Sequence, residues 1–453
     1  MNIKDDFILS QIDEGYLVGG SVRDFLMGKS FTDRDISIIG ALDFAKKIAE
    51  KFDATLVTLD TDNNIYRVVL PDKINYLDIS ELQGCTIEED LKRRDFTINA
   101  IAYDLKNDKF IDITGGRHDL DCKILRHIKD ENFLNDPLRV LRAFRFLSVT
   151  GFEPSKELLT SIDTYKSLLT KPSKERVSYE LMKLFGGSYA AKTLLLMDKF
   201  NILEHFFPLV SDMKKVPPNT HHHLDLFHHT VETVRNIEDL YLNCSNAEKE
   251  HLDKVDFGGF ARINHLKLAG FLHDIGKYST WTIEEDTGRH RFIKHDDVGS
   301  KMCGPLLKSL KFSKKQIEYI SKMIKTHIYP SNVISAPDLS EKVMMRYLRK
   351  MDEDVIDNIM LAKADRLSAR GVEITDSVVK SNIDGLNKLL KFYLEKRDTM
   401  QPLPKLLNGY EVMKLKNISQ SPKLGEIVKA LHEAQINGDV LTKEDAIEFV
   451  CKY

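Results

Sequence analysis

The stretch GYLVGGSVRDFLMGKSFTDRDISII, residues 15–39, decides the fold of the first part of the chain. A short apolar run at 16–18 ends in two glycines, and a helix-like segment then leads to Asp33, Asp35 and a second apolar run at 36–39. This order predicts a strand, a glycine turn, a helix and a second strand. Side chains two positions apart in a strand point to the same face, so we expect Asp33 and Asp35 to project together.

The two acids and the glycine turn indicate a kind of chemistry. Backbone amides of a glycine turn can approach a phosphate closely, and paired carboxylates bind Mg²⁺. The combination therefore suits magnesium-dependent phosphoryl or nucleotidyl transfer. Taken alone, Asp33 and Asp35 can equally stand in a solvated turn, so the decision depends on other motifs.

The composition describes a soluble globular protein and argues against several other classes. The 453 residues are 42% hydrophobic and 30% charged, and the formal net charge of -3 gives no global basic field for nucleic acid. No apolar run approaches the roughly 18 residues that a membrane helix needs, and residues 1–16 lack the apolar core of a signal peptide. The five cysteines contain no C-x-x-C pair, which favours a reducing cytoplasm over a disulfide framework or a cysteine zinc site.

The periodicity divides the chain into a mixed part and a helical part. Residues 1–116 alternate short apolar runs with helical stretches and predict a mixed α/β unit, whereas 3.6-residue periodicity dominates the rest. Pro217-Pro218 precedes a histidine-rich tract and marks a further boundary. We therefore predict four domains, at 1–116, 117–216, 217–370 and 371–453.

Two further motifs carry clustered arginines. The stretch RRDFTINA at 93–100 places two arginines, an acid and an amide before an apolar run. In NDPLRVLRAFRF at 135–146, Arg139, Arg142 and Arg145 recur every three residues near one face of a predicted helix. Arginines in such a row can donate paired hydrogen bonds to phosphate oxygens or base edges, although a solvated arginine face is the plainer explanation.

Together these motifs resemble the bacterial-type tRNA nucleotidyltransferases, the CCA-adding enzymes, and their relatives the bacterial poly(A) polymerases. The resemblance implies a nucleotidyltransferase head with a mixed, polymerase-β-like sheet, followed by an all-α neck, body, HD domain and tail. It covers most of the chain, with weaker similarity in a helical neck and in the tail. The matching stretches, in the family's order, are GGSVRD at 19–24, DRD at 33–35, RRDFTINA at 93–100, GGRHDL at 115–120 and DPLRVLRAFRF at 136–146.

The resemblance implies a catalytic site in the head. Asp33 and Asp35 would bind two magnesium ions that activate the RNA 3′-hydroxyl and clamp the α-phosphate of the incoming nucleotide. Asp78 is a candidate third carboxylate, although a strand-end surface acid explains it equally well. The family's nucleotide contacts fall on Gly19, Gly20 and Arg23 for the triphosphate, on Arg94 for the sugar or phosphates, and on Asp95 and Asn99 for the sugar pocket, where a local capping role competes.

The family selects its base without a nucleic-acid template, and side-chain chemistry allows this. A carboxylate accepts from the exocyclic amine that C and A carry, and an arginine donates to the adjacent ring nitrogen. Asp136 and Arg139 occupy the family positions for this pair, although Asp136 can instead be only the N-cap of its helix. Arg142 and Arg145 would complete the phosphate and base contacts, with CTP, ATP and the tRNA 3′ end as partners.

Two departures from the family pattern bear on the product. Asn135 stands where the family commonly has Glu, beside the base-reading position rather than in it. Many CCA-adding relatives also carry a long flexible segment between the carboxylate strands and the RRD motif, whereas here only residues 81–92 lie between Ser80 and Arg93. A shortened segment is typical of relatives that add only the two cytidines. Addition of CC alone is therefore kept as an alternative.

A second set of residues, within 217–370, is typical of a metal site. Imidazoles and carboxylates on successive predicted helices bind divalent metals. The set resembles an HD-type phosphohydrolase domain, in which a divalent ion would polarise a phosphate and lower the pKa of a water. Candidate substrates are 2′,3′-cyclic phosphates, 2′-phosphates or nucleotides, and a structural or vestigial role for some histidines is the alternative. The core ligands are His229, His273, Asp274 and Asp365, and His295 and His327 match positions used by two-metal members.

The resemblance thus predicts a cytoplasmic, magnesium-dependent nucleotidyltransferase that adds C and/or A to the tRNA 3′ terminus, with an HD hydrolase domain and no membrane partner. One rival is a poly(A) polymerase on the same scaffold, which would usually carry an extended basic tail. The other is an HD phosphohydrolase whose head only binds RNA. The sequence does not discriminate among CCA, CC and A as products, and it leaves the oligomeric state open.

Overall fold

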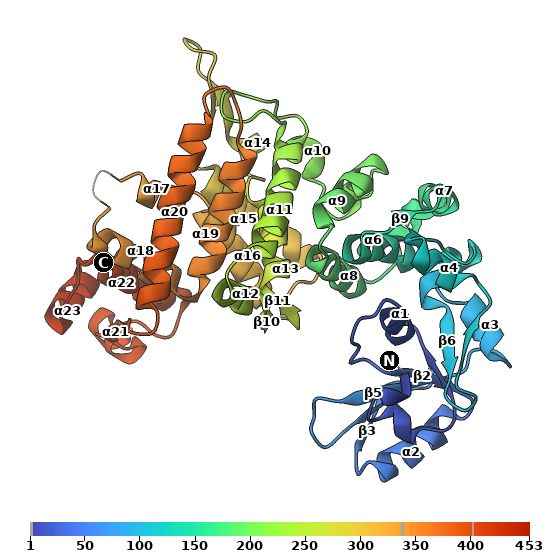
Figure 1. Cartoon of the computed structure of the whole chain (residues 1–453). Coiled ribbons are helices and arrows are strands. Elements are labelled where there is room, and N and C mark those ends of the chain that lie inside the picture. Colours follow the sequence, from blue (N-terminus) through green and yellow to red (C-terminus); the bar gives the residue numbers. More distant parts are fainter. Residues whose placement is uncertain (1–2, 337–338, 401–402) are drawn as a thin grey trace. The chain divides into compact units, whose positions relative to one another are not determined.

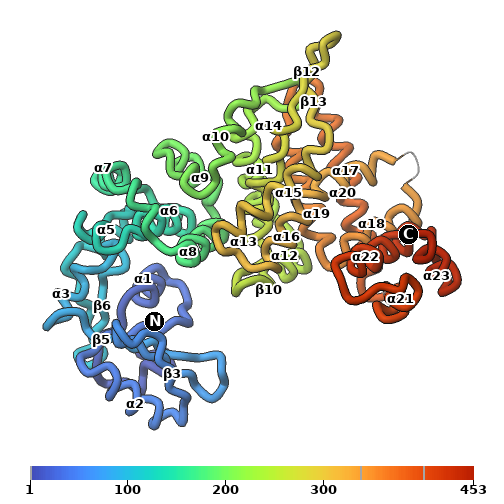
Figure 2. Tube along the Cα trace, turned by 180° about the vertical axis from the view of Figure 1, so that it is seen from behind, coloured from blue at the N-terminus to red at the C-terminus, as the bar shows by residue number. Residues whose placement is uncertain are grey.

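The computed structural model describes residues 3–336, 339–400 and 403–453. The chain forms two compact units, Met1–Phe206 and Phe207–Tyr453. Figure 1 and Figure 2 show their elements from two sides. The finer division into four domains stays a prediction. No described helix combines the length and the apolar character that are needed to cross a membrane.

The first unit is built around a seven-stranded sheet with the strand order β3-β4-β5-β2-β1-β6-β7. Strands β2 and β5 run parallel, and the other neighbouring pairs are antiparallel. The predicted mixed sheet is therefore confirmed. The strands are β1 (Tyr16–Val18), β2 (Asp35–Ile38), β3 (Thr55–Asp60), β4 (Ile65–Val69), β5 (Tyr76–Glu81), β6 (Ile101–Asp104) and β7 (Lys109–Asp112).

The predicted order of strand, glycine turn, helix and strand is also confirmed. β1 leads through Gly19, whose φ of 74° lies in the left-handed region that favours glycine, into α1 (Gly20–Leu26). The helix α2 (Ala41–Lys51) buries Phe44 and Ile48, four positions apart, and packs beside β4 and β5. The helix α3 (Ile87–Lys92) begins at Thr86, whose side chain accepts from the backbone N–H of Glu89.

The rest of the first unit is mainly helical. The helix α6 (Leu138–Thr150) buries its apolar stripe and packs against α8 (Lys174–Gly186). This pairing places the arginine face of α6 next to α8, so that side chains of the two helices meet. Its other α-helices and strands are α4 (Gly116–Asp121), β8 (Ile124–Leu125), α5 (Glu131–Asn135), β9 (Glu153–Pro154), α7 (Lys156–Tyr165) and α9 (Ala190–Lys199).

Where the structure describes it, the second unit is mainly helical and has two short ribbons, β10 (Val255–Phe257) with β11 (Phe260–Ala261) and β12 (Trp281–Ile283) with β13 (His290–Phe292). Helix α11 packs against α13 and α19, as Figure 1 shows in green, yellow-green and orange. These three helices form the centre on which the second site is built. The helices are α10 (Val210–Met213), α11 (Leu226–Leu242), α12 (Asn246–Asp253), α13 (Arg262–Leu272), α14 (Lys277–Thr280), α15 (His295–Ser309), α16 (Lys314–Thr326), α17 (Tyr329–Ile334), α18 (Glu341–Met351), α19 (Val355–Ser368) and α20 (Asp376–Lys396).

The end of the chain forms a small helical cluster, drawn in red in Figure 2. Three helices follow in order, α21 (Gly409–Lys416), α22 (Pro422–Asn437) and α23 (Lys443–Lys452). They enclose a hydrophobic cluster of their own that includes Val412, Ile427 and Val450, each fully buried.

Candidate functional site

The carboxylates predicted from the sequence meet at the centre of the sheet in the first unit. The parallel register of β2 and β5 pairs Asp35 with Asp78, so these neighbouring side chains share one face. Asp33 lies two residues before Asp35, and the hydroxyl of Tyr76 donates a hydrogen bond to its Oδ1 atom at 2.6 Å. We call Asp33, Asp35, Asp78 and the turn at Gly19 the head site.

The electrostatics of the head site suit a divalent cation. Desolvation and the negative charges of Asp78 and Asp33 raise the pKa of Asp35 to about 6, against the opposing charges of Arg94 and Arg67. A carboxylate that is partly protonated near neutral pH because other acids surround it gains when a hard cation binds among them. The donor set therefore fits a metal such as Mg²⁺.

Asp78 differs from the other two acids because it already has a counter-ion. Arg67 lies opposite Asp78 on β4 and donates to both of its oxygens, at 2.7 Å each. The guanidinium also lies 4.1 Å from the centroid of the Tyr76 ring. Arg67 and Tyr76 thus link Asp78 to Asp33. The role of Asp78 as a third metal-binding carboxylate stays a prediction.

The glycine turn borders the acids as the sequence predicted. A Cβ atom at Gly19 would lie 3.4 Å from Oδ2 of Asp35 and 3.5 Å from Nη1 of Arg94. Gly20 begins α1, and Arg23 on that helix donates to Oδ1 of Asn99 at 2.8 Å. The absent side chain at Gly19 leaves space directly beside Asp35, where a phosphate could approach.

The acid of the RRD motif, Asp95, is hydrogen-bonded within the protein interior. Asp95 is buried and accepts from Arg142 at 2.5 Å and from the side chain of Asn99 at 3.1 Å. Burial by itself would raise the pKa of Asp95, but these donors outweigh it and lower the pKa to about 2. Arg94 pairs with Asp90 at 2.8 Å. The nucleotide contacts predicted for Arg94, Asp95 and Asn99 stay predictions.

The three arginines of α6 have different partners. Glu180 on α8 pairs with Arg142 at 3.1 Å and with Arg145 at 2.8 Å. Arg145 also lies 3.8 Å from the centroid of the Phe146 ring. Arg139 forms no ion pair among the described residues, and its Nη1 atom donates only to the carbonyl of Arg94 at 3.4 Å. Arg139 is therefore the member of the row with most donor capacity left for a ligand.

Asp136 makes a local contact at the start of α6, and its role in reading the base stays a prediction. Its Oδ1 atom accepts from the backbone N–H of Leu138 at 3.3 Å, which is a capping contact at the start of α6. Its Oδ2 atom accepts from Arg176 on α8 at 2.8 Å. The candidate base-reading carboxylate is thus oriented by both helices.

In the second unit, six metal-type ligands meet from five segments. His229 comes from α11, His273 and Asp274 follow α13, and Asp365 lies on α19. Their ligand atoms lie within 4.8 Å of one another, and Asp274 also belongs to a second such group with His295 and His327. We call these six residues the HD site. Asp274 belongs to both groups and would be a ligand common to both if each group held an ion.

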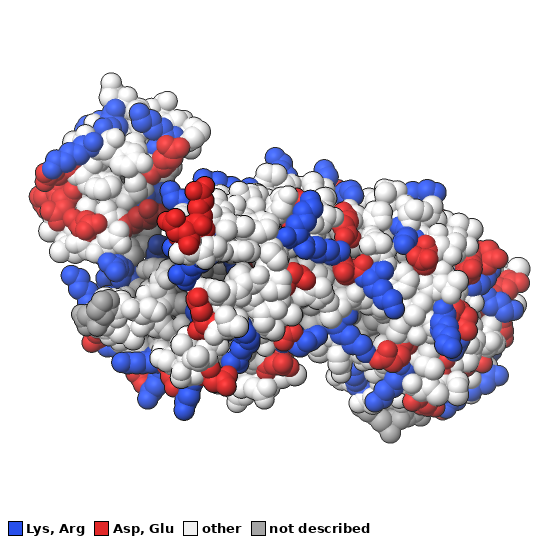
Figure 3. Space-filling view, turned by 90° about the horizontal axis from the view of Figure 1, so that it is seen from above, with Lys and Arg blue, Asp and Glu red and all other residues white. Residues whose placement is uncertain are grey.

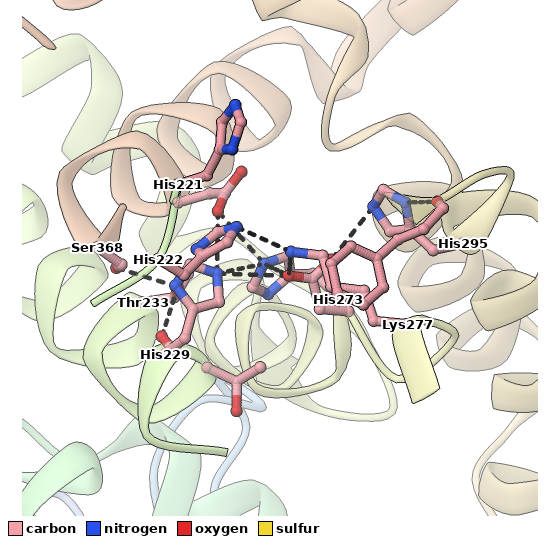
Figure 4. A network of polar contacts seen from close by, with 12 residues as sticks. His221, His222, His229, Thr233, His273, Lys277, His295 and Ser368 are labelled. Carbon is pink, nitrogen blue, oxygen red and sulfur yellow. Dashed lines mark hydrogen bonds and ion pairs between the residues drawn. The ribbon is translucent and has the colours of Figure 1, made fainter. Parts of the chain in front are cut away.

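The histidine rings are fixed with one nitrogen facing inward, as Figure 4 shows for His273 and His295. The Nδ1 atoms of His273, His295 and His327 lie 2.7, 2.8 and 2.7 Å from backbone carbonyl oxygens. An Nδ1–H donated to a carbonyl leaves Nε2 as a lone-pair ligand. The Nε2 atoms of His273 and His295 lie 3.1 and 3.2 Å from Asp274 oxygens.

Asp274 is the strongest sign that the HD site is built for a cation. Its side chain is buried, and among the described residues neither oxygen accepts a well-aligned hydrogen bond. Burial would raise the pKa of Asp274, but His273 and Lys277, whose Nζ atom lies 2.6 Å from Oδ2, hold it well below its usual range. A buried, charged carboxylate whose neighbours are imidazole nitrogens and one ammonium group fits a divalent metal.

Several residues of these sites were missed by sequence reasoning. They contact residues that were predicted, some from distant parts of the chain, as Glu180 does with Arg142, and some from only a few positions away, as Asp90 does with Arg94. The alternation along β5 could have paired Tyr76 with Asp78, and the helical spacing after Asp274 could have indicated Lys277. The missed residues are Arg67, Tyr76, Asp90, Glu180 and Lys277.

Comparison with known proteins places three family models along the chain. A poly A polymerase head domain matches residues 15–126. A probable RNA and SrmB-binding site of polymerase A matches residues 151–214. An HD domain matches residues 226–370. The first and last matches contain the head site and the HD site respectively.

Similar proteins extend over nearly the whole chain. A CC-adding tRNA nucleotidyltransferase of Thermus thermophilus is 29% identical over 98% of this chain and 95% of its own length. The solved structure of the Thermotoga maritima CCA-adding enzyme with tRNA has the same fold, with 22% identity and a TM-score of 0.53 over 97% of this chain and 91% of that one. An A-adding tRNA nucleotidyltransferase of Deinococcus radiodurans is 30% identical over 96% of this chain and 95% of its own length. The three family models match successive stretches of the chain, and the similarity to these enzymes extends over nearly all of it. The chain therefore belongs to the tRNA nucleotidyltransferase family.

Proposed function

We propose that this chain transfers C and/or A residues from CTP and ATP to the 3′ terminus of tRNA in the cytoplasm, without a nucleic-acid template. Its curated relatives are named for C or A addition to tRNA, and the Thermotoga relative was solved with tRNA. The observation that carries the proposal is the cluster of Asp33, Asp35 and Asp78 beside the Gly19 turn. Lys and Arg mix with Asp and Glu over the face in Figure 3, so tRNA would be recognised by local contacts.

In this mechanism the residues of the head site have separate tasks. Asp33 and Asp35 would hold Mg²⁺, which when bound acidifies the RNA 3′-hydroxyl and neutralises charge on the α-phosphate. The turn at Gly19 leaves room for the triphosphate, and Arg23 on α1 is positioned to contact it. The positive charge of Arg67 partly neutralises Asp78 and so reduces its repulsion of Asp35. The site thus gathers negative groups while limiting their mutual repulsion.

Base selection falls to Asp136 and Arg139. A carboxylate accepts from the amine of C or A, and a guanidinium donates to the adjacent ring nitrogen, whereas U and G would present a carbonyl oxygen to the carboxylate. Arg139 has donors to spare, and Arg176 with the start of α6 holds Asp136 in a defined orientation. Two oriented side chains then replace a template base.

As a narrower alternative within this proposal, we infer that addition ends at CC and uses CTP alone. Only residues 82–86 connect β5 to α3, and a short connection is typical of relatives that add only the two cytidines. The connection is also tied down: Glu81 accepts from the backbone N–H groups of Gly40 and Ala41 at 2.8 Å each, and Glu89 accepts from that of Cys85 at 2.6 Å. A segment held in this way has little freedom to move, so it is poorly suited to changing the specificity of the pocket from CTP to ATP.

Sizing the products on defined tRNA ends tests both proposals. Transcripts that end at the discriminator base, at C and at CC are each offered CTP or ATP separately. We expect extension to CC with CTP on the first two ends and no extension of the CC end with ATP. Addition of A to the CC end would overturn the CC-only proposal. A long A tract on unrelated RNA would instead favour a poly(A) polymerase.

We also propose that the HD site hydrolyses phosphate esters such as 2′,3′-cyclic phosphates, 2′-phosphates or nucleotides, with a divalent metal. The carrying observation is the position of Asp274 between two sets of imidazole ligands. A bound metal would polarise the phosphate and acidify a water. Hydrolysis of p-nitrophenyl phosphate, followed by absorbance with Mg²⁺, Mn²⁺ or Ni²⁺ added in turn, tests the proposal. No turnover with any metal would contradict it.

A further inference from the structure

A cavity of about 420 Å³ in the second unit is used by none of the roles described so far. It lies between the end of α17 and the first half of α20, with α19 contributing one wall. Its volume falls in the range of small-molecule sites. Its polar lining includes Arg366, Asn382 and the hydroxyl groups of Ser335, Ser377 and Ser381.

The helices hold this cavity open by their spacing. Ser377, Ser381 and Gly385 follow one another at four-residue intervals and so share one face of α20. At Gly385 the two helices are in close contact, because a Cβ atom there would lie 2.9 Å from Ile334. The polar residues lie N-terminal to this contact on α20, where the space between the helices is not filled by side chains.

Arg366 brings an unsatisfied positive group to the cavity. Its Nε atom is buried without a hydrogen-bond partner, and within the described ranges its guanidinium forms no ion pair. Arg370, one turn further along the chain, pairs with Asp376 at 2.9 Å. Leaving a buried guanidinium nitrogen without an acceptor is unfavourable, and a phosphate offers the acceptor geometry that it needs. The cavity therefore suits an anion.

Asn382 adds an unsatisfied acceptor to the same cavity. Its side-chain oxygen is buried without a partner, while its amide nitrogen donates to Ser331 at 3.4 Å. The phosphate group of a monoester, which is mostly dianionic at neutral pH, would satisfy Arg366 but offers no donor for this oxygen. A ligand with both phosphate oxygens and hydroxyl groups satisfies both, and serine hydroxyls can bind either. That combination describes a phosphorylated sugar such as a nucleotide.

The cavity is linked to the HD site along the chain. Arg366 directly follows the ligand Asp365 on α19, and α17 begins two residues after the ligand His327. The charge of Arg366 also reaches the rim of the HD site. Burial lowers the pKa of His221, and the positive charges of Arg289, Arg366 and Lys277 lower it further. Arg366 and Lys277, which contacts Asp274, thus act on one histidine at the rim.

We propose that this cavity is the substrate-recognition part of the HD site and binds a second phosphate and its ribose, so that the preferred substrate is a ribonucleotide carrying two phosphate groups. One phosphate ester meets the metal ligands and the other phosphate meets Arg366. Hydrolysis adds water across the ester P–O bond and releases inorganic phosphate and the sugar hydroxyl, while the second phosphate stays in place. This inference rests on the proposed hydrolase function of the HD site.

The test compares two substrates that differ only in the second phosphate, adenosine 2′-monophosphate and adenosine 2′,5′-bisphosphate, with the full chain and Mn²⁺. We expect the wild type to hydrolyse the bisphosphate with a KM about tenfold lower, since a charge-assisted contact is worth about a factor of ten or more. Arg366→Gln should bring the two KM values together. Arg370→Gln, the matched control, should keep the wild-type ratio. Equal KM values in the wild type, or a preference that survives Arg366→Gln, would overturn the proposal.

A binding measurement separates this proposal from that of hydrolysis. If p-nitrophenyl phosphate and both nucleotides remain intact with every metal, the hydrolase function fails, and the difference in binding between wild type and Arg366→Gln, measured by calorimetry, then reports on the cavity. Titration of adenosine 2′,5′-bisphosphate should show binding about tenfold weaker in Arg366→Gln than in wild type and in Arg370→Gln. Equal affinities in all three proteins would rule out the cavity as a phosphate site.

Discussion

The head site and the HD site treat their carboxylates in different ways. In the head site, Tyr76 donates a hydrogen bond to Asp33, and Arg67 donates to both oxygens of Asp78. Two of the three acids therefore have protein partners. In the HD site, Asp274 is buried among imidazoles and accepts no well-aligned hydrogen bond from the described residues. Partners in a half-exposed site can be exchanged as substrate arrives, whereas a buried carboxylate surrounded by imidazole nitrogens favours a resident cation. The comparison predicts transient metal in the head and retained metal in the HD site.

Replacing Asp33 and Asp35 with Ala is expected to have the largest effect. The change removes both candidate magnesium ligands, so nucleotide addition should fall by about 10³-fold or more, the equivalent of several kcal/mol. Extension of tRNA on denaturing gels measures the loss. Turnover of p-nitrophenyl phosphate at the HD site serves as the control and should persist. Addition that survives the double change would refute the assignment of the head site.

Replacing Asp274 with Asn should have the next largest effect, and this effect should be confined to the HD site. The neutral amide removes the charge shared by both ligand groups while keeping the shape, so the protein as purified should carry less divalent metal and lose ester hydrolysis. Elemental analysis after dialysis measures the metal content. Nucleotide addition should stay at the wild-type level. An undiminished metal content would show that the retained ion lies elsewhere.

The pH dependence of metal binding in the head site gives a third, smaller effect. Because the pKa of Asp35 is raised to about 6, its carboxyl is protonated below that pH, and Mn²⁺ affinity should fall as the pH falls through 6. The positive Arg67 lowers this pKa, so Arg67→Ala should move the transition upward by about one pH unit.

Calorimetry in the Asp274→Asn background isolates the head site for this measurement. Arg67→Lys, which keeps the positive charge, is the matched control and should titrate near the wild type. A transition that stays in place in Arg67→Ala would mean that the charge of Arg67 does not reach Asp35, and the account of the head-site electrostatics would be wrong.

The head illustrates how far local patterns extend. The order of β1, α1 and β2 and the shared face of Asp33 and Asp35 follow from period-two alternation and a glycine turn, which are local properties. The partnership of Arg67 with Asp78 depends on β4 lying beside β5, and that of Asp35 with Asp78 on β2 running parallel to β5. Strand order is set by packing across the whole sheet, so local sequence patterns could not predict these contacts.

The HD site shows the same limit in a helical setting. Its six candidate ligands were predicted from residue types and order by resemblance, and the structure brings them together in two groups that share Asp274. The carbonyls that fix the rings of His273, His295 and His327 lie three residues before each histidine, but which helix ends face one another is decided by tertiary packing. The cavity beside Arg366 likewise depends on where α20 approaches α17, which periodicity alone does not specify.

The smallest expected effect concerns base selection in the first unit. Arg176 holds Oδ2 of Asp136 at 2.8 Å, but its own side chain is 54% exposed, and exposed ion pairs contribute about 0.2–1 kcal/mol. Arg176→Ala should therefore lower the preference for CTP over UTP, measured as the ratio of kcat/KM values, by about fivefold at most. Lys174→Ala, at the start of the same helix, should leave the ratio unchanged. An unchanged ratio in Arg176→Ala would mean that the capping contact with Leu138 alone orients Asp136, whereas a loss of about a hundredfold would place Arg176 in direct contact with the base.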